Sequence, residues 1–382
     1  MRTIYFDYNA TTPLDPQVRE AMLPILSETW GNPSSVHHVG RKARAILDES
    51  RDRAAKILKC KPSEVIFTSG GTESVNLAIF GVARLLKSKG RHIVTSAIEH
   101  HAVLHPFEYL ARTESFETTL LPVNREGLIS EDSLERAIRP DTILVSLMAA
   151  NNEIGTIQPV AEFGAVCRQH GVLFHTDAVQ WFGKEPFESI HQFNADLVSI
   201  CAHKFHGPKG AGALFVKSPL LPDPILFGGS HENERRAGTE NVAAIAGLVE
   251  ALERFVPKPV FQREKLAPLS SRLINLLDNL ARVHFAGSRQ QRLANTVSFL
   301  VEGADSIALL AALDMEGICA SSGSACSAGS LKPSHVISAL GVDRKMANSL
   351  VRFSLGRDSA MEEVERVEEA LPDVIRRALQ FQ

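Results

Sequence analysis

Lys204 is the residue whose setting in this sequence points most clearly to chemistry. It lies in the segment SICAHKFHGPKG at 199–210, just past an apolar strand and before a Gly-Pro turn. Open α/β sheets bind ligands at such strand ends. A lysine held there by rigid backbone and partly removed from water has a lowered pKa, and its neutral amine can form a Schiff base. Because lysines are almost always exposed, this interpretation depends on neighbouring segments.

Two further strand ends carry groups that suit a phosphorylated ring compound. Gly71 and Thr72 follow a strand and open a helix, whose free amides and positive dipole end suit a phosphate. An ordinary helix start explains that pattern equally well. Asp177 ends another strand, with Gln180 three residues on. A carboxylate there can keep a ring nitrogen protonated, as cofactors of the pyridoxal phosphate type require, or can simply cap the next helix.

Polar pairs close two more predicted strands. Asn151 and Asn152 follow the strand that ends near Met148, and His100 and His101 follow the strand that ends near Ser96. Adjacent residues of an extended chain face opposite ways, so one member of each pair is expected to point into a site.

The cysteines are five in number, widely spaced and without a C-x-x-C pair, so neither disulfides nor a zinc knuckle is indicated. Cys60, Cys167 and Cys319 lie in or beside apolar patterns, as small buried hydrophobic residues do. Cys326 differs, because it lies in SSGSACSAGS at 321–330, a run of small residues with glycines on both sides. That composition predicts a loop that can change position, as a sulfur carrier would need.

The elements that position these residues alternate between short apolar runs and longer helical patterns, from Glu64 to about Lys217. The alternation predicts a mostly parallel sheet covered on both faces. The predicted strands are 65–68, 92–96, 142–148, 172–176, 196–201 and 213–216. The predicted helices are 17–28, 36–58, 131–138, 241–255 and one that opens at Pro159 and closes at His170-Gly171.

Prolines at 257 and 259 break the helix predicted at 241–255. Beyond them the pattern changes to a shorter β-β-α-β-α run. We therefore expect an α/β fold with a large domain of residues 13–257 and a smaller α+β domain of residues 258–382 joined by 1–12. The predicted strands of the small domain are 283–285, 296–301 and 350–354. Its predicted helices are 261–280, 305–315, 334–340 and 361–379, the last interrupted at Pro372.

Composition excludes several classes of function. With 382 residues, 44% apolar and 22% charged, the chain is typical of soluble proteins of two domains. Basic and acidic residues, 41 against 44, give a net charge of -3 without long like-charge runs, so nucleic acid is not an expected partner. No apolar run reaches the about 18 residues that a membrane span needs, and the N-terminus has no signal-peptide pattern. A cytoplasmic location is the expectation.

Beyond these segments, the sequence resembles the cysteine desulfurases of the NifS/IscS family, which belong to the pyridoxal phosphate enzymes of fold type I. The resemblance runs nearly end to end. Besides the strand-end segments, the motifs that carry it are YFDYNATTP at 5–13, GNPSS at 31–35, RRAGTEN at 235–241, SSGSACS at 321–327 and VRFSLG at 351–356.

The resemblance implies a role for each candidate residue. Lys204 would form the Schiff base with pyridoxal phosphate, Asp177 would pair with the ring nitrogen, and His100 would stack on the ring and move protons. The other implied cofactor contacts are Gly71, Thr72, Cys201 and His203 at the phosphate, Gln180 and Asn152 at the ring hydroxyl, and Thr239 from the partner subunit of a homodimer. Arg352 would clamp the substrate carboxylate, with Asn32 and Asn152 in the same pocket.

One position departs from the family, which commonly has Ser where this chain has Cys201. A thiol is a weaker hydrogen-bond donor than a hydroxyl, so this phosphate contact is weakened.

The implied reaction converts L-cysteine to L-alanine, with a persulfide formed on Cys326 and passed to an acceptor such as an iron–sulfur scaffold protein. The SSGSAC segment resembles the class of these enzymes with a longer loop. A selenocysteine lyase would use the same residues and stays open, as does an aminotransferase, which would have no use for Cys326. A sulfur-relay scaffold without catalysis would leave Lys204 and Asp177 unexplained. No metal site is implied.

Overall fold

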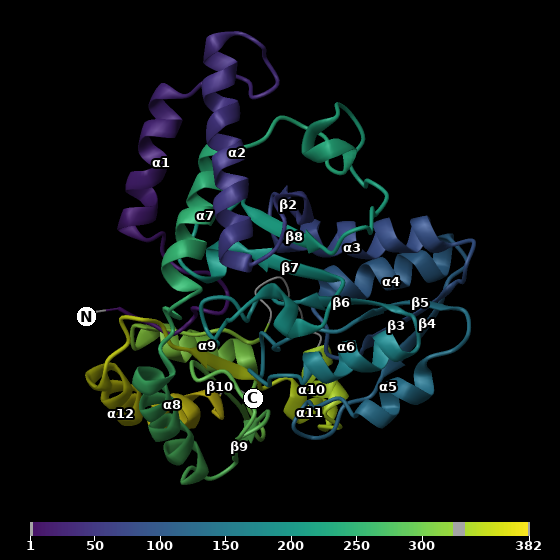
Figure 1. Ribbon diagram of the computed structural model, residues 1–382. Helices are drawn as coiled ribbons and strands as arrows, with labels where there is room; N and C mark the ends of the chain where they lie inside the picture. The colour runs from purple at the N-terminus through teal and green to yellow at the C-terminus, as the bar shows by residue number, and fades with distance from the viewer. Residues whose placement is uncertain (1–2, 324–332, 381–382) are drawn as a thin grey trace.

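The computed structural model describes residues 3–323 and 333–380 and centres on a seven-stranded mixed sheet (Figure 1). The strand order is β2-β8-β7-β6-β5-β3-β4. Strand β8 runs antiparallel to both β2 and β7, and the other neighbouring pairs are parallel. The strands are β2 (Val65–Thr68), β3 (His92–Ser96), β4 (Glu117–Leu121), β5 (Thr142–Ser146), β6 (Leu173–Asp177), β7 (Leu197–Cys201) and β8 (Gly212–Val216).

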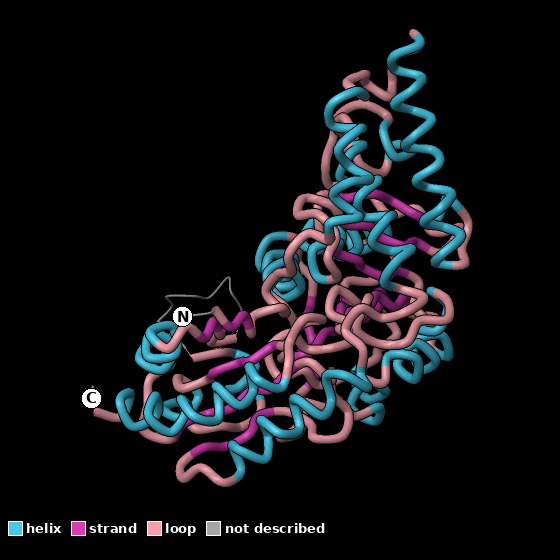
Figure 2. Tube along the Cα trace, turned by 90° about the vertical axis from the view of Figure 1, so that its left-hand side faces the viewer, coloured by secondary structure: helices cyan, strands magenta, loops and turns pink. Residues whose placement is uncertain are grey.

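Helices cover both faces of this sheet, and β2, β3, β5, β7 and β8 are accordingly buried along their whole length. Figure 2 shows the strands as an inner layer with helices outside. Helices α1, α2 and α7 pack against one another at one end of the sheet, and α1 and α2 extend beyond it (Figure 1). The helices of this part are α1 (Pro16–Glu28), α2 (His38–Leu58), α3 (Gly71–Leu86), α4 (His101–Thr113), α5 (Glu131–Ala137), α6 (Val160–Gln169) and α7 (Val242–Phe255).

A second, antiparallel sheet of order β12-β10-β9 lies beside the first, with its own apolar core. Its strands are β9 (Val283–Ala286), β10 (Thr296–Val301) and β12 (Val351–Ser354). The helices around it are α8 (Arg263–Asp278), α9 (Ser306–Met315), α10 (His335–Ala339), α11 (Arg344–Ala347) and α12 (Met361–Ala378). The N-terminal strand β1 (Ile4–Tyr5) pairs in parallel with β11 (Ile318–Cys319), so the chain begins in this second core.

The predicted α/β fold is confirmed, and the predicted strands of the main sheet agree with the observed ones to within one or two residues. Strand β4 was missed because it lies at the sheet edge, where its mostly exposed or half-buried residues lack an apolar run. The predicted interruption at Pro372 is wrong, since α12 continues through it. Proline removes one helical hydrogen bond, but Leu371, Val374 and Ile375 on either side are buried and hold the helix in place.

The domain boundary predicted at 257/258 stays a prediction. Within 3–323 and 333–380 no helix is long and apolar enough to cross a membrane.

Strand direction decides where the candidate residues gather. Strands β3, β5, β6 and β7 are parallel, and β2 runs the same way because both β2 and β7 are antiparallel to β8. Their carboxyl ends therefore meet at one edge of the sheet, facing the second core. This edge is where an open α/β sheet places its ligand.

Candidate active site

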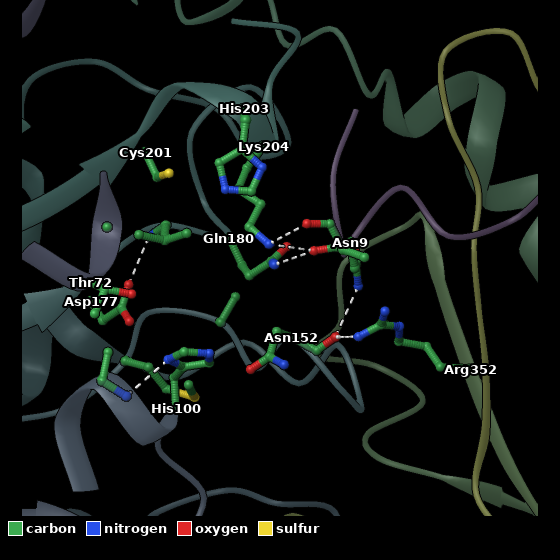
Figure 3. A pocket seen from close by; sticks show the side chains of 16 residues that line it. Asn9, Thr72, His100, Asn152, Asp177, Gln180, Cys201, His203, Lys204 and Arg352 are labelled. Atoms are coloured by element: carbon green, nitrogen blue, oxygen red, sulfur yellow. Dashed lines mark hydrogen bonds between the residues drawn. The ribbon is translucent and has the colours of Figure 1, made fainter. Parts of the chain in front are cut away.

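The carboxyl edge of the large sheet holds a cavity of about 210 Å³. Ten of the predicted site residues line it together: Gly71, Thr72, His100, Asn152, Asp177, Gln180, Cys201, His203, Lys204 and Arg352. Figure 3 shows their side chains converging from strand ends and from the second sheet. The remaining lining residues are Asn9, Ala10, Ala102, Met148, Ala150 and Val179.

Lys204 lies in a single 3-10 turn that follows β7. Its Nζ donates hydrogen bonds to the backbone oxygens of Asn9 and Ala10, at 2.8 Å each (Figure 3). Burial lowers the pKa of Lys204 from 10.5 to about 8. A substantial fraction of this amine is therefore neutral near pH 8, as a nucleophile or base must be.

Asp177 is the last residue of β6, and its Oδ1 accepts a hydrogen bond of 3.0 Å from the backbone N–H of Val179. Burial raises its pKa from 3.8 to about 6, although that hydrogen bond and Lys204 both oppose the rise. This carboxyl can therefore share a proton with a basic ring nitrogen near neutral pH.

His100 caps the N-terminus of α4, where its Nδ1 accepts a hydrogen bond of 3.0 Å from the N–H of Ala102. The accepting Nδ1 assigns the ring proton to Nε2. Burial, followed by the positive charge of Lys204, lowers the pKa of His100 to about 4. His101 packs instead against His105 and His335, so one histidine of the pair faces the cavity, as predicted.

Gly71 and Thr72 begin α3, Cys201 lies beside Gly71, and His203 lines the same cavity. A Cβ added to Gly71 would lie 2.9 Å from Val179 Cγ2 and 3.3 Å from Cys201 Cβ. Glycine at this position therefore lets the start of α3 approach Val179 and Cys201 closely. Burial raises the pKa of Cys201, so its thiol is uncharged.

Arg352 reaches the cavity from β12 of the second sheet and is only 1% exposed. Its Nη2 donates to Asp7 Oδ1 at 2.6 Å, and its Nη1 donates to the backbone oxygen of Asn152 at 2.8 Å. The Nε atom is buried without a hydrogen-bond partner in the described part of the chain. The ion pair with Asp7 compensates the burial of this guanidinium, whose remaining donors a substrate carboxylate could use.

Asn32 and Thr239 do not belong to the cavity as the described chain forms it. Asn32 is exposed in the turn before α2, where its Oδ1 accepts a hydrogen bond of 2.8 Å from the N–H of Ser34. The expectation that Asn32 lines this pocket is therefore not met within a single chain. Thr239 is likewise exposed, and its role toward a partner subunit stays a prediction.

Cys326 lies outside the described residues. The chain on either side of 324–332 is placed, and both ends lie against Glu153. Ser334 donates to Glu153 Oε2 at 2.5 Å, and a Cβ at Gly323 would lie 2.7 Å from the same oxygen. Because Glu153 follows the cavity residue Asn152, the described residues Gly323 and Ser334 lie close to the cavity.

Sequence reasoning missed Asn9, whose backbone oxygen holds Lys204 and whose side chain contacts Asn152 and Lys184. These three partners lie 143 to 195 positions away in the sequence, so spacing could not reveal them. The motif that contains Asn9, YFDYNATTP, was the only available signal.

The site can be compared with known proteins. The family model for class-V aminotransferases matches residues 4–367. The cysteine desulfurase IscS of Dictyoglomus turgidum is 46% identical over 98% of this chain and 95% of its own length. The corresponding protein of Methanosarcina thermophila is 45% identical over 98% of this chain and 93% of its own.

Solved structures of a NifS-like protein and of a cysteine desulfurase also resemble this chain. A NifS-like protein superposes with a TM-score of 0.91 at 36% identity, covering 98% of this chain and all of the other. The apo cysteine desulfurase of Thermococcus onnurineus NA1 has a TM-score of 0.86 at 27% identity, covering 98% of this chain and 95% of the other.

The chain thus belongs to the class-V aminotransferase family, whose model matches it nearly from end to end. Within that class it belongs to the cysteine desulfurase family of the IscS and NifS type. Pyridoxal phosphate is the cofactor of this family.

The cavity fits pyridoxal phosphate. A largely desolvated lysine amine, a buried carboxyl with a pKa near neutrality and a helix N-terminus without obstructing side chains all face the same space. Lys204, Asp177 and the residues at the start of α3 are the groups that would hold its aldehyde, ring nitrogen and phosphate.

Proposed function

We propose that this protein converts L-cysteine to L-alanine at this cavity and carries the released sulfur as a persulfide on Cys326. One observation supports the assignment best: a single cavity is lined both by Lys204, whose amine is desolvated and has a lowered pKa, and by Asp177, whose carboxyl has a raised pKa. When bound, pyridoxal phosphate would supply the electron sink that stabilises negative charge at the substrate's α-carbon.

Each residue then has a defined task. Arg352 would bind the substrate carboxylate with the donors that Asp7 and Asn152 leave free, and so orient the α-carbon toward Lys204. The Lys204 amine would take the α-proton, for which its lowered pKa is suited. Asp177 would hold the proton it shares with the ring nitrogen, while His100 would present its Nε2–H to the substrate side.

Sulfur transfer would follow at Cys326. The thiolate would attack the sulfur of the bound cysteine, so that an S–S bond forms while the C–S bond breaks. The electron pair of the C–S bond would pass to the substrate's β-carbon, which takes up a proton. Lys204 would return the α-proton to the α-carbon, so that the product leaves as alanine.

The partners of this reaction are part of the same proposal. We propose a homodimer in which Thr239, exposed in the single chain, contacts the phosphate bound to the other subunit. The persulfide would pass to an acceptor protein, and the naming of the relatives as IscS favours an iron–sulfur scaffold as that acceptor.

The test is a serine substitution at Cys326, with Cys319→Ser as the matched control. Cys319 is half-buried in β11, and its pKa is raised by burial, so its thiol is a poor nucleophile. We expect Cys326→Ser to keep the yellow cofactor and to bind L-cysteine while releasing no sulfide, and Cys319→Ser to remain active. Full desulfuration by Cys326→Ser would exclude the proposed persulfide carrier.

Parallel assays with L-cysteine and L-selenocysteine distinguish the lyase alternative, because a selenocysteine lyase would turn over only the second substrate. A half-reaction with a keto acid tests the aminotransferase alternative in the same preparation.

A further inference from the structure

A second lysine is buried behind the cavity and has no part in the reaction proposed above. Lys184 lies seven residues after Asp177, in the turns that follow β6, and is only 3% exposed. Lysines are almost never buried to this degree without a specific set of partners. The partners of Lys184 therefore show what this side chain does.

The Lys184 amine donates hydrogen bonds to two side-chain amides. Its Nζ lies 2.6 Å from Asn9 Oδ1 and also bonds to Gln180 Oε1. Burial, together with the charges of Lys204 and Arg352, holds the pKa of Lys184 well below its usual value. Two of its N–H groups are therefore directed at these two amide oxygens.

These contacts settle which way both amides face. Because Gln180 Oε1 meets a donor, Nε2 of Gln180 is turned toward the backbone oxygen of Asn9, at 3.0 Å. Asn9 Oδ1 accepts from both Lys184 and Asn295 Nδ2, so Asn9 Nδ2 faces Thr296 Oγ1 at 2.9 Å and the Asn152 backbone oxygen at 3.2 Å. A flipped amide would place oxygen against oxygen at either residue.

The same network reaches the two cations that face the cavity. The Asn9 backbone oxygen that accepts from Gln180 also accepts from Lys204 Nζ, and the Asn152 oxygen that accepts from Asn9 also accepts from Arg352 Nη1. Figure 3 shows this continuous row from Lys204 and Gln180 through Asn9 and Asn152 to Arg352. Lys184, which does not line the cavity, donates to the side chains of Asn9 and Gln180 in the middle of that row.

We propose that Lys184 is a positioning residue, whose two N–H groups fix the amides of Gln180 and Asn9 and, through them, the places of the Lys204 amine and the Arg352 guanidinium. The other charged groups near Lys184 do not replace it, because its neighbour Glu185 is paired with Arg263 at 2.8 Å. The inference rests on the proposed function, since it assigns Lys204 and Arg352 to cofactor and substrate.

Lys184→Met tests the proposal, because methionine replaces the aliphatic stem and removes both donors. We expect the pH midpoint of the visible cofactor absorption to rise by about one unit, since a loosened Gln180 donates less well to the ring hydroxyl. We also expect KM for L-cysteine to rise roughly tenfold, with a smaller change in kcat, as Arg352 loses its fixed place. Lys87→Met, at an exposed lysine just after α3, is the control and should match the wild type.

A double-mutant cycle shows whether the effect passes through Gln180. Once Gln180→Met is present, adding Lys184→Met should leave the absorption midpoint nearly unchanged. A Lys184→Met protein with the wild-type midpoint and KM overturns the inference, and so does an equal midpoint shift with and without Gln180. Absence of visible absorption in both the wild type and Lys87→Met would instead contradict the proposed function.

The cycle remains informative if Lys184→Met does not fold. Replacing both hydrogen-bond partners by apolar side chains removes the unpaired acceptor that the single substitution leaves on Gln180. The Gln180→Met/Lys184→Met protein should then fold under conditions in which Lys184→Met does not. If Gln180→Met folds while the double variant does not, the contact between Lys184 and Gln180 is not what matters, and the proposal fails.

Discussion

The two walls of the cavity treat buried charge in opposite ways. On the wall built by the large sheet, burial moves Lys204, Asp177 and His100 toward their neutral forms, with pKa values of about 8, about 6 and about 4. On the wall built by the second sheet, Arg352 is buried almost completely, but it lies 2.6 Å from the carboxylate of Asp7, which compensates the burial of its charge.

The difference follows from what each wall has to do. A group that exchanges protons needs a pKa near the working pH, which desolvation without a close counter-ion provides. A group that only binds a carboxylate must stay charged throughout, and a buried charge is tolerated when it is paired and hydrogen-bonded. Substitutions on the large-sheet wall should therefore lower the rate of the chemical step. Substitutions on the wall of the second sheet should instead weaken substrate binding.

The largest effect is expected at Lys204. Lys204→Ala removes the amine that would take the α-proton, so alanine formation should fall by about 10²–10⁴-fold, the usual contribution of a positioned base. After borohydride reduction, mass spectrometry should find the cofactor on the peptide that contains residue 204 in the wild type and not in the variant. Lys209→Ala, at an exposed lysine in the same segment, is the control. Retained turnover in Lys204→Ala would break the assignment of chemistry to the large-sheet wall.

The next effect tests the binding wall. Arg352→Lys keeps the charge but loses the planar fork, so it cannot serve Asp7, Asn152 and a substrate carboxylate together. KM for L-cysteine should rise by about 10–100-fold, with a much smaller change in kcat. Arg357→Lys, at a more exposed arginine paired with Asp15, should leave KM unchanged. A fall in kcat with constant KM would place Arg352 among the groups that act in the chemical step.

The pH dependence of cofactor uptake sharpens the comparison further. Only the neutral Lys204 amine can attack the aldehyde of pyridoxal phosphate, and its pKa is lowered to about 8. The rate at which apoprotein turns yellow should therefore rise about tenfold per pH unit below pH 8 and level off above it. Stopped-flow absorbance between pH 6 and 10 measures this rate. A rise that continues toward 10.5, the usual lysine value, would mean that Lys204 is solvated in the protein.

The contrast between the walls also explains what the sequence could predict. Lys204, Asp177 and His100 lie at the carboxyl ends of β7, β6 and β3, which run in the same direction in the mixed sheet, and strand ends of one direction meet at one edge. Their convergence could therefore be predicted from apolar periodicity and the residues that follow it. The lowered pKa of Lys204 followed from the same placement, because a strand end under a second layer is desolvated.

The binding wall could not be predicted in that way. Arg352 meets Asp7 and Asn152 across 345 and 200 positions of sequence, and Lys184 meets Asn9 across 175. No periodicity relates such partners. Their contact depends on how the segments at β1 and β12, far apart in the sequence, are brought together beside the large sheet. The resemblance to cysteine desulfurases suggested Arg352 but was silent on Asp7 and Lys184, whose parts became visible only as contacts.

The smallest effect is expected at Cys201, the position at which the resemblance to cysteine desulfurases implies a serine. The thiol lies beside Gly71 at the phosphate end and is buried, with a raised pKa. Cys201→Ser replaces a weak donor by a stronger one of similar size, so cofactor affinity should increase by about 2–10-fold, the value of one ordinary hydrogen bond. Dialysis against cofactor-free buffer, followed by visible absorbance, measures the retention. Cys167→Ser places the same hydroxyl in the apolar core beneath α6, where it should lower the melting temperature without changing retention. Equal retention in Cys201→Ser and the wild type would mean that this side chain makes no contact with the phosphate, which would then be held by α3, Thr72 and His203.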